Sequence, residues 1–562
     1  MSRNKKIENK HVVIFGAGIA GLTAAHEFIK YGYQVSVHEV NNEAGGFFRS
    51  ARCKKDMGMP SEYSWHGIGP WYHNVFSILK EIPFDGANSL YDKVLSRPID
   101  FGIAPNEGKA QFDDSSSWVI DVKKMFRLTT LDKILATYLM MKVWCSKKRS
   151  EKKYSTINAK EAWRPLMSEE GLATWCSSFG PWVGSDWLNV SLHQAGHFFR
   201  KQLISKPSYL HAGDAEGGPW RHGSRSGWLL LNSPSNEAWF DKWIYHLKNS
   251  GVYFFWNSEL IDLNVEHERI SSAKLLSGEI IKADIFILAI NPFFTSRIVD
   301  NNPALKKDSQ LQLFSKLIHK GPHIQVSLRI AFSEKIYWPR KRCALVLADS
   351  LFDLTLFAQE QAWVPEVYLG ERIESLWTVT ACVSSVPGKL YGIPLEKCTK
   401  EQFIDEVMDQ LKSSGALDTL IKEANYGKTW TDYPIERVEV WHEWIFSEDG
   451  IKGSQPKWVN STNNQIYIPK QKTSFENLAL AGAHTATEVD VWSIEAAVES
   501  GRRAVKIFES NVKIIPQYRP LIFKILSAVD DILFILRLPN ILDVFFISVG
   551  AVIIYATLRG IY

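Results

Sequence analysis

The sequence predicts an α/β protein, and three features of its first forty residues lead to that prediction. An apolar run at residues 11–15 is expected to form a buried strand, and residues 34–39 are expected to form a second. The glycine-rich stretch between them opens a helix that reaches about Tyr31 and ends at Gly32. A strand, a helix and a second strand in this order form the βαβ unit that begins a Rossmann-like domain.

Three glycines mark the turn between the first strand and the helix. Gly16 allows the chain to turn sharply, Gly18 lets the backbone approach a pyrophosphate, and Gly21 lets the helix pack closely on the strand. The start of the helix, at Ile19 and Ala20, offers free N–H groups and the positive end of the helix dipole. This turn therefore predicts a dinucleotide site.

A carboxylate ends the second strand. Glu39, followed by Val40, is placed to accept hydrogen bonds from the hydroxyl groups of a ribose. A negative charge at this position disfavours a 2′-phosphate, so NADP is not expected at the site.

Two adjacent glycines follow the carboxylate. Gly45 and Gly46 again predict close approach of the backbone to phosphate, and they precede Phe47. Arg49 is expected to neutralise a phosphate charge. The position of this loop directly after Glu39 favours a role in nucleotide binding.

A third segment near the other end of the chain has a related pattern. The apolar strand expected at residues 478–481 leads through Gly482 to a helix expected over residues 493–509. The N-terminus of that helix can face the ribityl chain or the pyrimidine ring of a flavin.

In this order, the motifs resemble those of FAD-dependent amine oxidases and phytoene-desaturase-like enzymes. The resemblance rests on the first glycine turn with Glu39, the Gly45–Gly46 pair, the strand at residues 283–289 and the block at residues 481–501. It implies FAD as the cofactor, with the adenine near Glu39 and Leu260. It also implies the following set of cofactor-binding residues: Gly16, Gly18, Ile19, Ala20, Gly21, Glu39, Val40, Gly45, Gly46, Phe47, Arg49, Trp65, His66, Gly67, Leu260, Ala289, Gly482, Ala483, His484, Trp492, Ser493 and Ile494.

Two details favour the carotenoid-desaturase side of this superfamily. Residues 64–74, which include Trp65 and His66, are similar to a His/Gly/aromatic/Asn stretch that lies beside the flavin in desaturases. Amine oxidases often have an aromatic residue where this chain has Ser493, directly after Trp492.

The chain also departs from the pattern of the family. Ala483 and His484 stand where these enzymes usually carry an acid against the flavin. Phe47 and Phe48 separate the double glycine from Arg49, whereas the family often has arginine directly after it. Flavin binding is expected to survive both changes.

His66 is the candidate catalytic residue, because a histidine beside a flavin can accept a proton. The alternative is a structural histidine that positions the flavin or a turn. The spacing of His, Cys, Asp and Glu predicts no metal site and no Ser/His/Asp set.

The resemblance implies a desaturase or dehydrogenase that acts on a hydrophobic, isoprenoid- or lipid-like substrate by hydride transfer to flavin N5. Oxygen or a quinone would then accept the electrons. Three alternatives stay open: an amine oxidase, a flavin-dependent isomerase and, in another class, a non-catalytic lipid-binding escort protein.

Composition limits the possible partners. With 65 basic and 61 acidic residues the net charge is +4, which gives no indication of nucleic-acid binding. The six cysteines form no CxxC pair, as expected for reduced thiols in the cytoplasm. The oligomeric state is not predicted.

The expected domains are interleaved. Residues 1–85, 235–300 and 470–512 are predicted to form the FAD-binding domain. Residues 86–234 and 301–469 are predicted to form an α+β substrate domain, and residues 513–562 a helical tail.

The tail is apolar, and it predicts attachment to the cytoplasmic face of a membrane. Residues 544–558 carry no charge, but as a helix they span roughly 22 Å, which is less than the ~30 Å of a hydrocarbon core. A short tilted anchor or an in-plane helix is therefore expected. The alternative is a helical pair packed on the protein or on a second subunit. Residues 125–145 are expected to form an apolar helix, followed by the basic run 147–153. This helix is expected to be either a buried domain helix with a solvated end or a helix that dips into a membrane surface, with the basic run on lipid headgroups.

Overall fold

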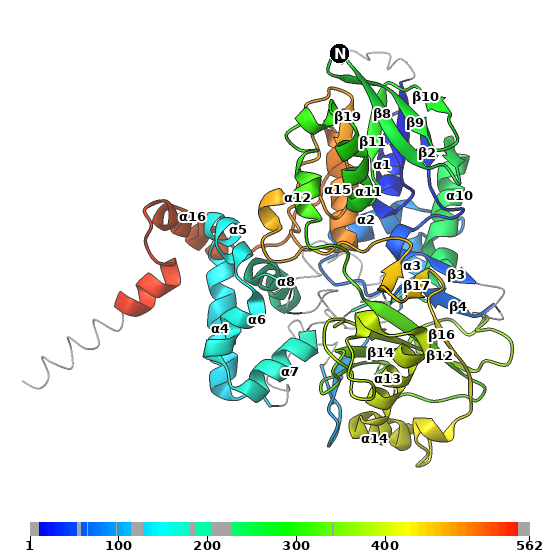
Figure 1. The fold of residues 1–562 in the computed structure, drawn as a ribbon, viewed down its shortest axis with the longest axis vertical. Coiled ribbons are helices and arrows are strands. Elements are labelled where there is room, and N and C mark those ends of the chain that lie inside the picture. The colour runs from blue at the N-terminus through cyan, green and yellow to red at the C-terminus, as the bar shows by residue number, and fades with distance from the viewer. Residues whose placement is uncertain are drawn as a thin grey trace, which may run out of the picture.

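The computed structural model contains two main sheets and a separate group of helices (Figure 1). It describes residues 10–52, 58–64, 66–96, 98–113, 127–179, 187, 189–204, 228–339 and 342–548. The α/β prediction is confirmed.

The first sheet has five parallel strands in the order β19–β11–β1–β2–β7. Their bounds are β1 His11–Phe15, β2 Gln34–His38, β7 Val252–Phe255, β11 Ile285–Leu288 and β19 Leu478–Leu480. Alternate side chains of β1 enter two different cores, Val12 and Ile14 on one face and Val13 and Phe15 on the other. Because both faces are covered, the strand is apolar throughout.

Helices and a small sheet cover the two faces. On one face, α1 (Ile19–Lys30) packs against α15 (Ile494–Lys506), where a Cβ at Gly501 would lie 2.5 Å from the carbonyl oxygen of Ala20. The other face is covered by the antiparallel sheet β10–β9–β8 and by α11 (Pro292–Asn301). The bounds of that sheet are β8 Leu260–Glu266, β9 Arg269–Leu275 and β10 Ile280–Ile281.

The second sheet has seven strands in the order β16–β12–β15–β14–β13–β5–β6. Its strands are β5 Phe101–Ala104, β6 Gln111–Phe112, β12 Val326–Phe332, β13 Ala344–Leu347, β14 Leu354–Ala358, β15 Ser375–Ala381 and β16 Ile435–Val440. The pairing is antiparallel except between β5 and β13. All seven strands lie within the segments predicted for the substrate domain, and the five strands of the first sheet lie within those predicted for the flavin domain.

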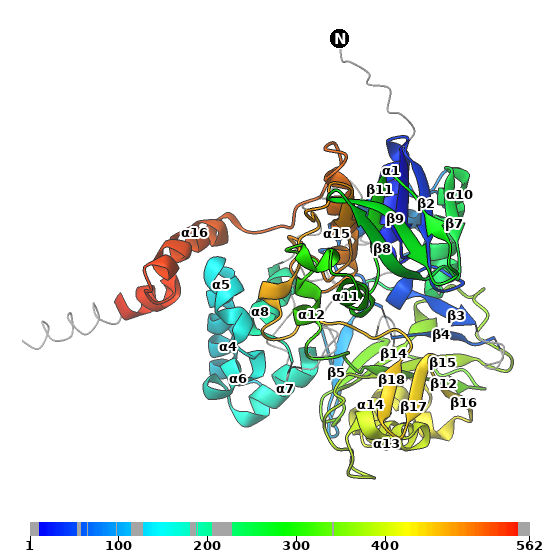
Figure 2. The same cartoon turned by 45° about the horizontal axis from the view of Figure 1, so that its top comes forward.

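The third part is a helical lobe that stands beside the second sheet (Figures 1 and 2). It consists of α4 Thr130–Trp144, α5 Lys148–Lys152, α6 Ala159–Trp163, α7 Glu169–Phe179 and α8 Leu192–Ile204. Close packing of α4 on α8 depends on Gly196, because a Cβ there would lie 2.6 Å from the Cβ of Val143. The carbonyl oxygen of Gly196 also accepts a hydrogen bond of 2.7 Å from Trp144 Nε1. The C-terminal helix α16 (Leu521–Ile535) lies against α5 and projects away from the rest of the molecule.

A short hairpin follows the double-glycine loop and consists of β3 (Ser50–Arg52) and β4 (Pro60–Glu62). A helix that begins at Asn236 as a π-helical turn continues as α10 (Asp241–Asn249). The remaining named elements are α2 His73–Glu81, α3 Leu90–Lys93, α12 Leu313–Leu317, α13 Lys400–Lys412, α14 Gly415–Ala424, β17 Trp444–Ser447 and β18 Gly450–Gly453.

Within the described part of the chain, no helix has the length and apolar character needed to cross a bilayer. Residues 549–558, which belong to the predicted tail segment, lie outside the described residues.

Candidate functional site

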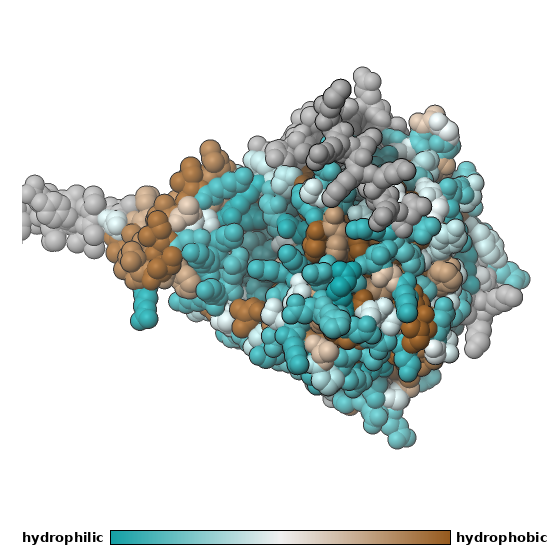
Figure 3. Space-filling model, turned by 90° about the horizontal axis from the view of Figure 1, so that it is seen from above, coloured by the Kyte–Doolittle hydropathy of each residue, from teal (hydrophilic) through white to brown (hydrophobic). Residues whose placement is uncertain are grey.

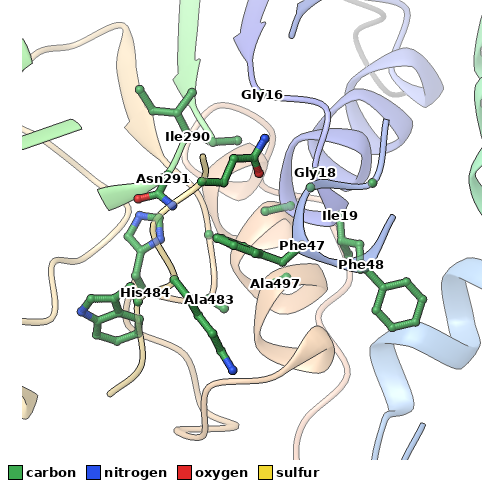
Figure 4. A pocket seen from close by; sticks show the side chains of 18 of the residues that line it. Gly16, Gly18, Ile19, Phe47, Phe48, Ile290, Asn291, Ala483, His484 and Ala497 are labelled. Carbon is green, nitrogen blue, oxygen red and sulfur yellow. The ribbon is translucent and has the colours of Figure 1, made fainter. Parts of the chain in front are cut away.

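A cavity of about 580 Å³ lies between the two sheet domains (Figure 4). Nearly all of the predicted cofactor-binding residues line it: Gly16, Gly18, Ile19, Ala20, Glu39, Val40, Gly45, Gly46, Phe47, His66, Gly67, Leu260, Ala289, Gly482, Ala483, His484, Trp492, Ser493 and Ile494. Gly21 and Arg49 lie outside the lining, and Trp65 lies outside the described residues.

The first glycine turn has the geometry that the sequence predicts. Gly16 has a φ of +105°, and a Cβ there would lie 2.4 Å from the carbonyl oxygen of Ala289, directly after the neighbouring strand β11. A Cβ at Gly21 would lie 1.9 Å from the carbonyl oxygen of Gly16. Gly21 therefore serves helix packing rather than direct contact with a ligand, as its position in the motif predicts.

The second glycine pair is held against this turn. The N–H of Gly45 donates to the carbonyl oxygen of Ala17 at 3.0 Å. A Cβ on Gly46 would meet the Cα of Gly18 at 3.4 Å, so the two backbones face each other without intervening side chains. No side chain caps α1 at Gly18, and the first N–H groups of a helix have no partner within the helix. The result is a backbone cradle suited to phosphate.

Glu39 is buried and braced by its neighbours. One carboxylate oxygen accepts from the N–H of Ala17 at 2.7 Å, and the other accepts from Asn41 through its backbone N–H at 3.0 Å and its Nδ2 at 2.6 Å. A carboxylate has about four acceptor positions. Glu39 therefore fixes the glycine turn and keeps acceptor capacity for a hydroxyl group in the cavity.

Arg49 does not take the predicted position beside a phosphate. Its guanidinium is buried and forms ion pairs with Glu443 and with Glu43, the latter at 3.2 Å. It also donates to the carbonyl oxygen of Gly46 at 3.0 Å. Because two carboxylates already neutralise it, Arg49 acts as a clamp behind the double-glycine loop.

His66 lines the cavity, but its ring is directed at protein acceptors. Its Nε2 lies 3.1 Å from the carbonyl oxygen of Phe47, which can only accept, so this nitrogen carries the proton. Its Nδ1 lies 3.5 Å from Glu62, and its ring packs on Phe48 at 4.0 Å. The structure thus favours the structural alternative over catalysis by His66.

The third predicted segment forms the opposite wall. Gly482, with a φ of +139°, brings the backbone against the ring of His484, whose burial lowers its pKa to about 3. Ser493 caps α15, because its Oγ accepts from the N–H of Ala496 at 3.2 Å. A neutral imidazole therefore stands at the position where the resemblance implies an acid.

Sequence reasoning missed Lys457, which follows β18 and lines the same cavity. Its side chain is buried, donates to Gln325 Oε1 and lies 4.9 Å from the ring centre of Trp492. Burial lowers the pKa of Lys457 to about 7. No spacing rule points to a lone lysine in a loop, so only the fold reveals it.

A histidine–aspartate group behind this wall was also missed. His193, His197 and Asp490 offer ligand atoms within 4.8 Å of one another. The closest pair, His193 Nε2 and Asp490 Oδ2, is 2.8 Å apart, and Asp490 also accepts from Gln465 at 2.9 Å. These contacts hold the loop that leads to Trp492.

The cavity fits an extended dinucleotide with a flavin ring. The Gly18–Gly46 cradle leaves room that a Cβ would fill, and Glu39 stands beside it. The far wall is aromatic, with Trp492 and neutral His484, and Lys457 is the cation beside it. FAD would be held by the cradle and Glu39 at its nucleotide end and by Gly482 and the start of α15 at its ring end.

Two families match this chain. Residues 14–82 match a family described as an NAD(P)-binding Rossmann-like domain, and residues 330–507 match one described as flavin containing amine oxidoreductase. Together with the site, these matches support FAD as the cofactor of an oxidoreductase with the fold of the FAD amine oxidase superfamily.

Solved structures of other proteins have a similar fold. A triple mutant of putrescine oxidase has 14% sequence identity and a TM-score of 0.60, over 89% of this chain and 99% of the other. Cyclohexylamine oxidase from Brevibacterium oxydans IH-35A has 14% identity and a TM-score of 0.55, over 90% and 99%. An L-amino-acid oxidase of Siganus canaliculatus is 35% identical over 89 residues, which cover 15% of this chain and only 17% of that enzyme. The predicted closeness to carotenoid desaturases finds no support in these comparisons.

Proposed function

We propose that the protein oxidises a hydrophobic, uncharged substrate with FAD as the electron acceptor. The observation that carries this proposal is the composition of the cavity wall. Among the described lining residues, the carboxylates are Glu39 and Glu259. Glu39 follows β2 and Glu259 precedes β8, and both lie at the nucleotide end. The opposite part of the wall contains aromatic side chains and Lys457 instead.

This arrangement favours a neutral ligand over a cationic one. Tyr72, Trp228, Trp458 and Trp492 supply an apolar, aromatic surface. A protonated amine in this region would meet Lys457 and no lining carboxylate among the described residues. An isoprenoid- or other lipid-like substrate suits such a wall.

When bound, FAD supplies the capacity to take a hydride from a substrate carbon. The chain's own contribution is orientation, exclusion of water and control of a proton. Lys457, with a pKa of about 7, is partly neutral near physiological pH and is placed at the cavity to accept a proton from the substrate. Gln325 and the ring of Trp492 fix its side chain.

Oxidation of an amine is the second candidate. It is favoured by the match of residues 330–507 to flavin containing amine oxidoreductases and by the amine oxidases among the similar structures. A neutral amine beside Trp492 and neutral Lys457 would meet no repulsion, so this activity would need a pH above about 7.

Anaerobic mixing of the purified holoprotein with candidate substrates tests both proposals. Loss of the oxidised-flavin absorbance with isoprenoid or other neutral lipids, and not with amines, is the expected result. Faster reduction by monoamines, polyamines or amino acids would replace the first proposal by the second. Reoxidation by oxygen, measured as hydrogen peroxide, or by a soluble quinone then identifies the electron acceptor.

A further inference from the structure

The C-terminal helix α16 buries Ser527 and Asp530 and exposes all four of its isoleucine side chains, with Lys524 exposed among them. Ser527 and Asp530 are 4% and 0% exposed, whereas Ile522, Ile525 and Ile532 are 55%, 53% and 59% exposed. A helix on the surface of a globular protein normally has the opposite distribution. Figure 3 shows the hydrophobic surface that results on the projecting arm, which consists of α16 and residues 541–548.

Polar contacts hold the helix in this orientation. Asp530 forms a buried ion pair with Arg149, 3.0 Å from its Nε, and accepts from Ser146 Oγ at 2.7 Å. The Arg149 guanidinium also donates to the carbonyl oxygens of Leu538 at 3.0 Å and Pro539 at 3.2 Å. Breaking a buried pair is costly. The outward apolar face is therefore a fixed feature of the fold.

The apolar surface extends beyond α16. Ile535, Leu536 and Leu538 are exposed, and so are Phe545, Phe546 and Ile547 in the helical turns that follow. Single exposed apolar side chains are normal, but a contiguous patch of this kind marks an interaction site. In the sequence, no charged residue occurs between Asp543 and Arg559.

Positive charge borders this surface. A second cavity, of about 720 Å³, lies where the end of α16 meets the helical lobe. Its lining includes two apolar side chains of the tail and four cations: Phe534, Leu538, Lys142, Arg149, Lys153 and Arg537. Two of the cations are neutralised, Arg149 by Asp530 and Lys142 by Asp543 at 2.8 Å, while Lys153 and Arg537 are exposed. The neighbouring Lys147, Lys148 and Lys152 are exposed as well.

We propose that α16, residues 541–548 and the basic α5 form one docking surface for a bilayer that contains anionic phospholipid. The apolar face would enter the boundary between headgroups and acyl chains, with a phosphate headgroup beside Lys153 and Arg537.

A second copy of the chain fits this docking surface less well than an anionic bilayer does. A twofold interface places the same surface on both sides. It would therefore bring the two basic borders together, whereas anionic headgroups neutralise them. This proposal concerns the arm alone and does not depend on the reaction at the flavin.

Vesicle flotation of the full-length holoprotein tests the proposal. We expect flotation with vesicles of phosphatidylcholine and phosphatidylglycerol, and much weaker flotation with phosphatidylcholine alone. Raising the salt from about 0.1 M to about 0.5 M should weaken the binding severalfold, because exposed charges are screened.

Variants separate the apolar and the ionic parts. Ile525→Glu combined with Ile532→Glu should weaken binding to anionic vesicles at least about tenfold, because two apolar side chains no longer enter the lipid. The matched control combines Leu276→Glu and Ile280→Glu, since these residues are similarly exposed (66% and 49%), Leu276 directly after β9 and Ile280 in β10. Lys153→Glu with Arg537→Glu should abolish the preference for phosphatidylglycerol.

Flavin content and thermal unfolding establish that each variant is folded. Unchanged flotation of the folded Ile525/Ile532 variant would overturn the proposal. It would also be overturned if the wild type fails to float and sedimentation shows a dimer that this variant dissociates, because a second copy would then cover the arm.

Discussion

The two ends of the central cavity are built in different ways. The nucleotide end is made of backbone, where Gly18 and Gly46 face each other and the start of α1 supplies N–H groups. The opposite end is made of side chains. Lys457 and Gln325, from the segment predicted for the substrate domain, lie against Trp492, from the segment predicted for the flavin domain. The first end comes from residues close together in the sequence, and the second from segments far apart.

This difference separates cofactor binding from substrate chemistry. A backbone cradle recognises phosphate whatever the substrate, so its motif is shared by many dinucleotide-binding proteins. The side-chain end can change without loss of the fold, and we propose that it selects the molecule that is oxidised. Variants at the two ends should therefore affect different measurements.

The largest effect is expected from Lys457→Met. Loss of a proton acceptor should slow substrate-dependent flavin reduction by about 100- to 10,000-fold while FAD content stays unchanged. In the wild type the rate should rise with pH through about 7, since Lys457 is an ammonium below that pKa and cannot accept a proton. Stopped-flow reduction over a range of pH measures both effects. A variant that keeps the wild-type rate and pH profile would exclude this role.

The next effect is expected from Gly18→Asp. The Cβ position at Gly18 is open, with Gly46 Cα at 3.9 Å, so the fold should survive. A carboxylate about 4 Å from the pyrophosphate costs about 4 kcal/mol, or roughly 1,000-fold in FAD affinity. Titration of the apoprotein with FAD measures the loss, and Gly86→Asp is the control because nothing lies within 4 Å of its Cβ position. Normal FAD affinity in the Gly18 variant would show that the phosphate does not bind beside this turn.

A smaller effect is expected from Glu39→Gln. The amide oxygen can still accept from the N–H of Ala17, but the charged acceptor for a ribose hydroxyl is lost. Hydrogen bonds to charged groups contribute about 1.5–3 kcal/mol, so FAD affinity should fall roughly 10- to 100-fold. The same titration measures it. If thermal stability falls but FAD affinity does not, Glu39 stabilises the glycine turn and does not bind the ribose.

The smallest effect is expected from His66→Gln. Glutamine can still donate to the carbonyl oxygen of Phe47, which accepts from His66 Nε2 at 3.1 Å in the wild type. A less favourable geometry in this one hydrogen bond should change the rate of flavin reduction by at most about tenfold. A far larger loss in flavin reduction, with full FAD content, would restore His66 as the catalytic residue.

Much of the nucleotide end could be predicted from the sequence, because its determinants are local. Glycines at fixed offsets, an apolar strand and a terminal carboxylate are visible without knowledge of the fold. Arg49 shows the limit of this reasoning. Its partner Glu443 is almost 400 residues away in the sequence. The motif therefore predicts a phosphate beside Arg49, whereas the fold places a carboxylate there.

The sequence by itself determined the βαβ unit, the two later FAD segments and the apolar nature of the tail, because these depend on short-range periodicity and on glycine geometry. Only the tertiary structure decided where Lys457 lies, which way the ring of His66 points and which face of α16 is outside. Those features depend on contacts between distant segments, such as the ion pair of Asp530 with Arg149. A local pattern carries no information about such contacts.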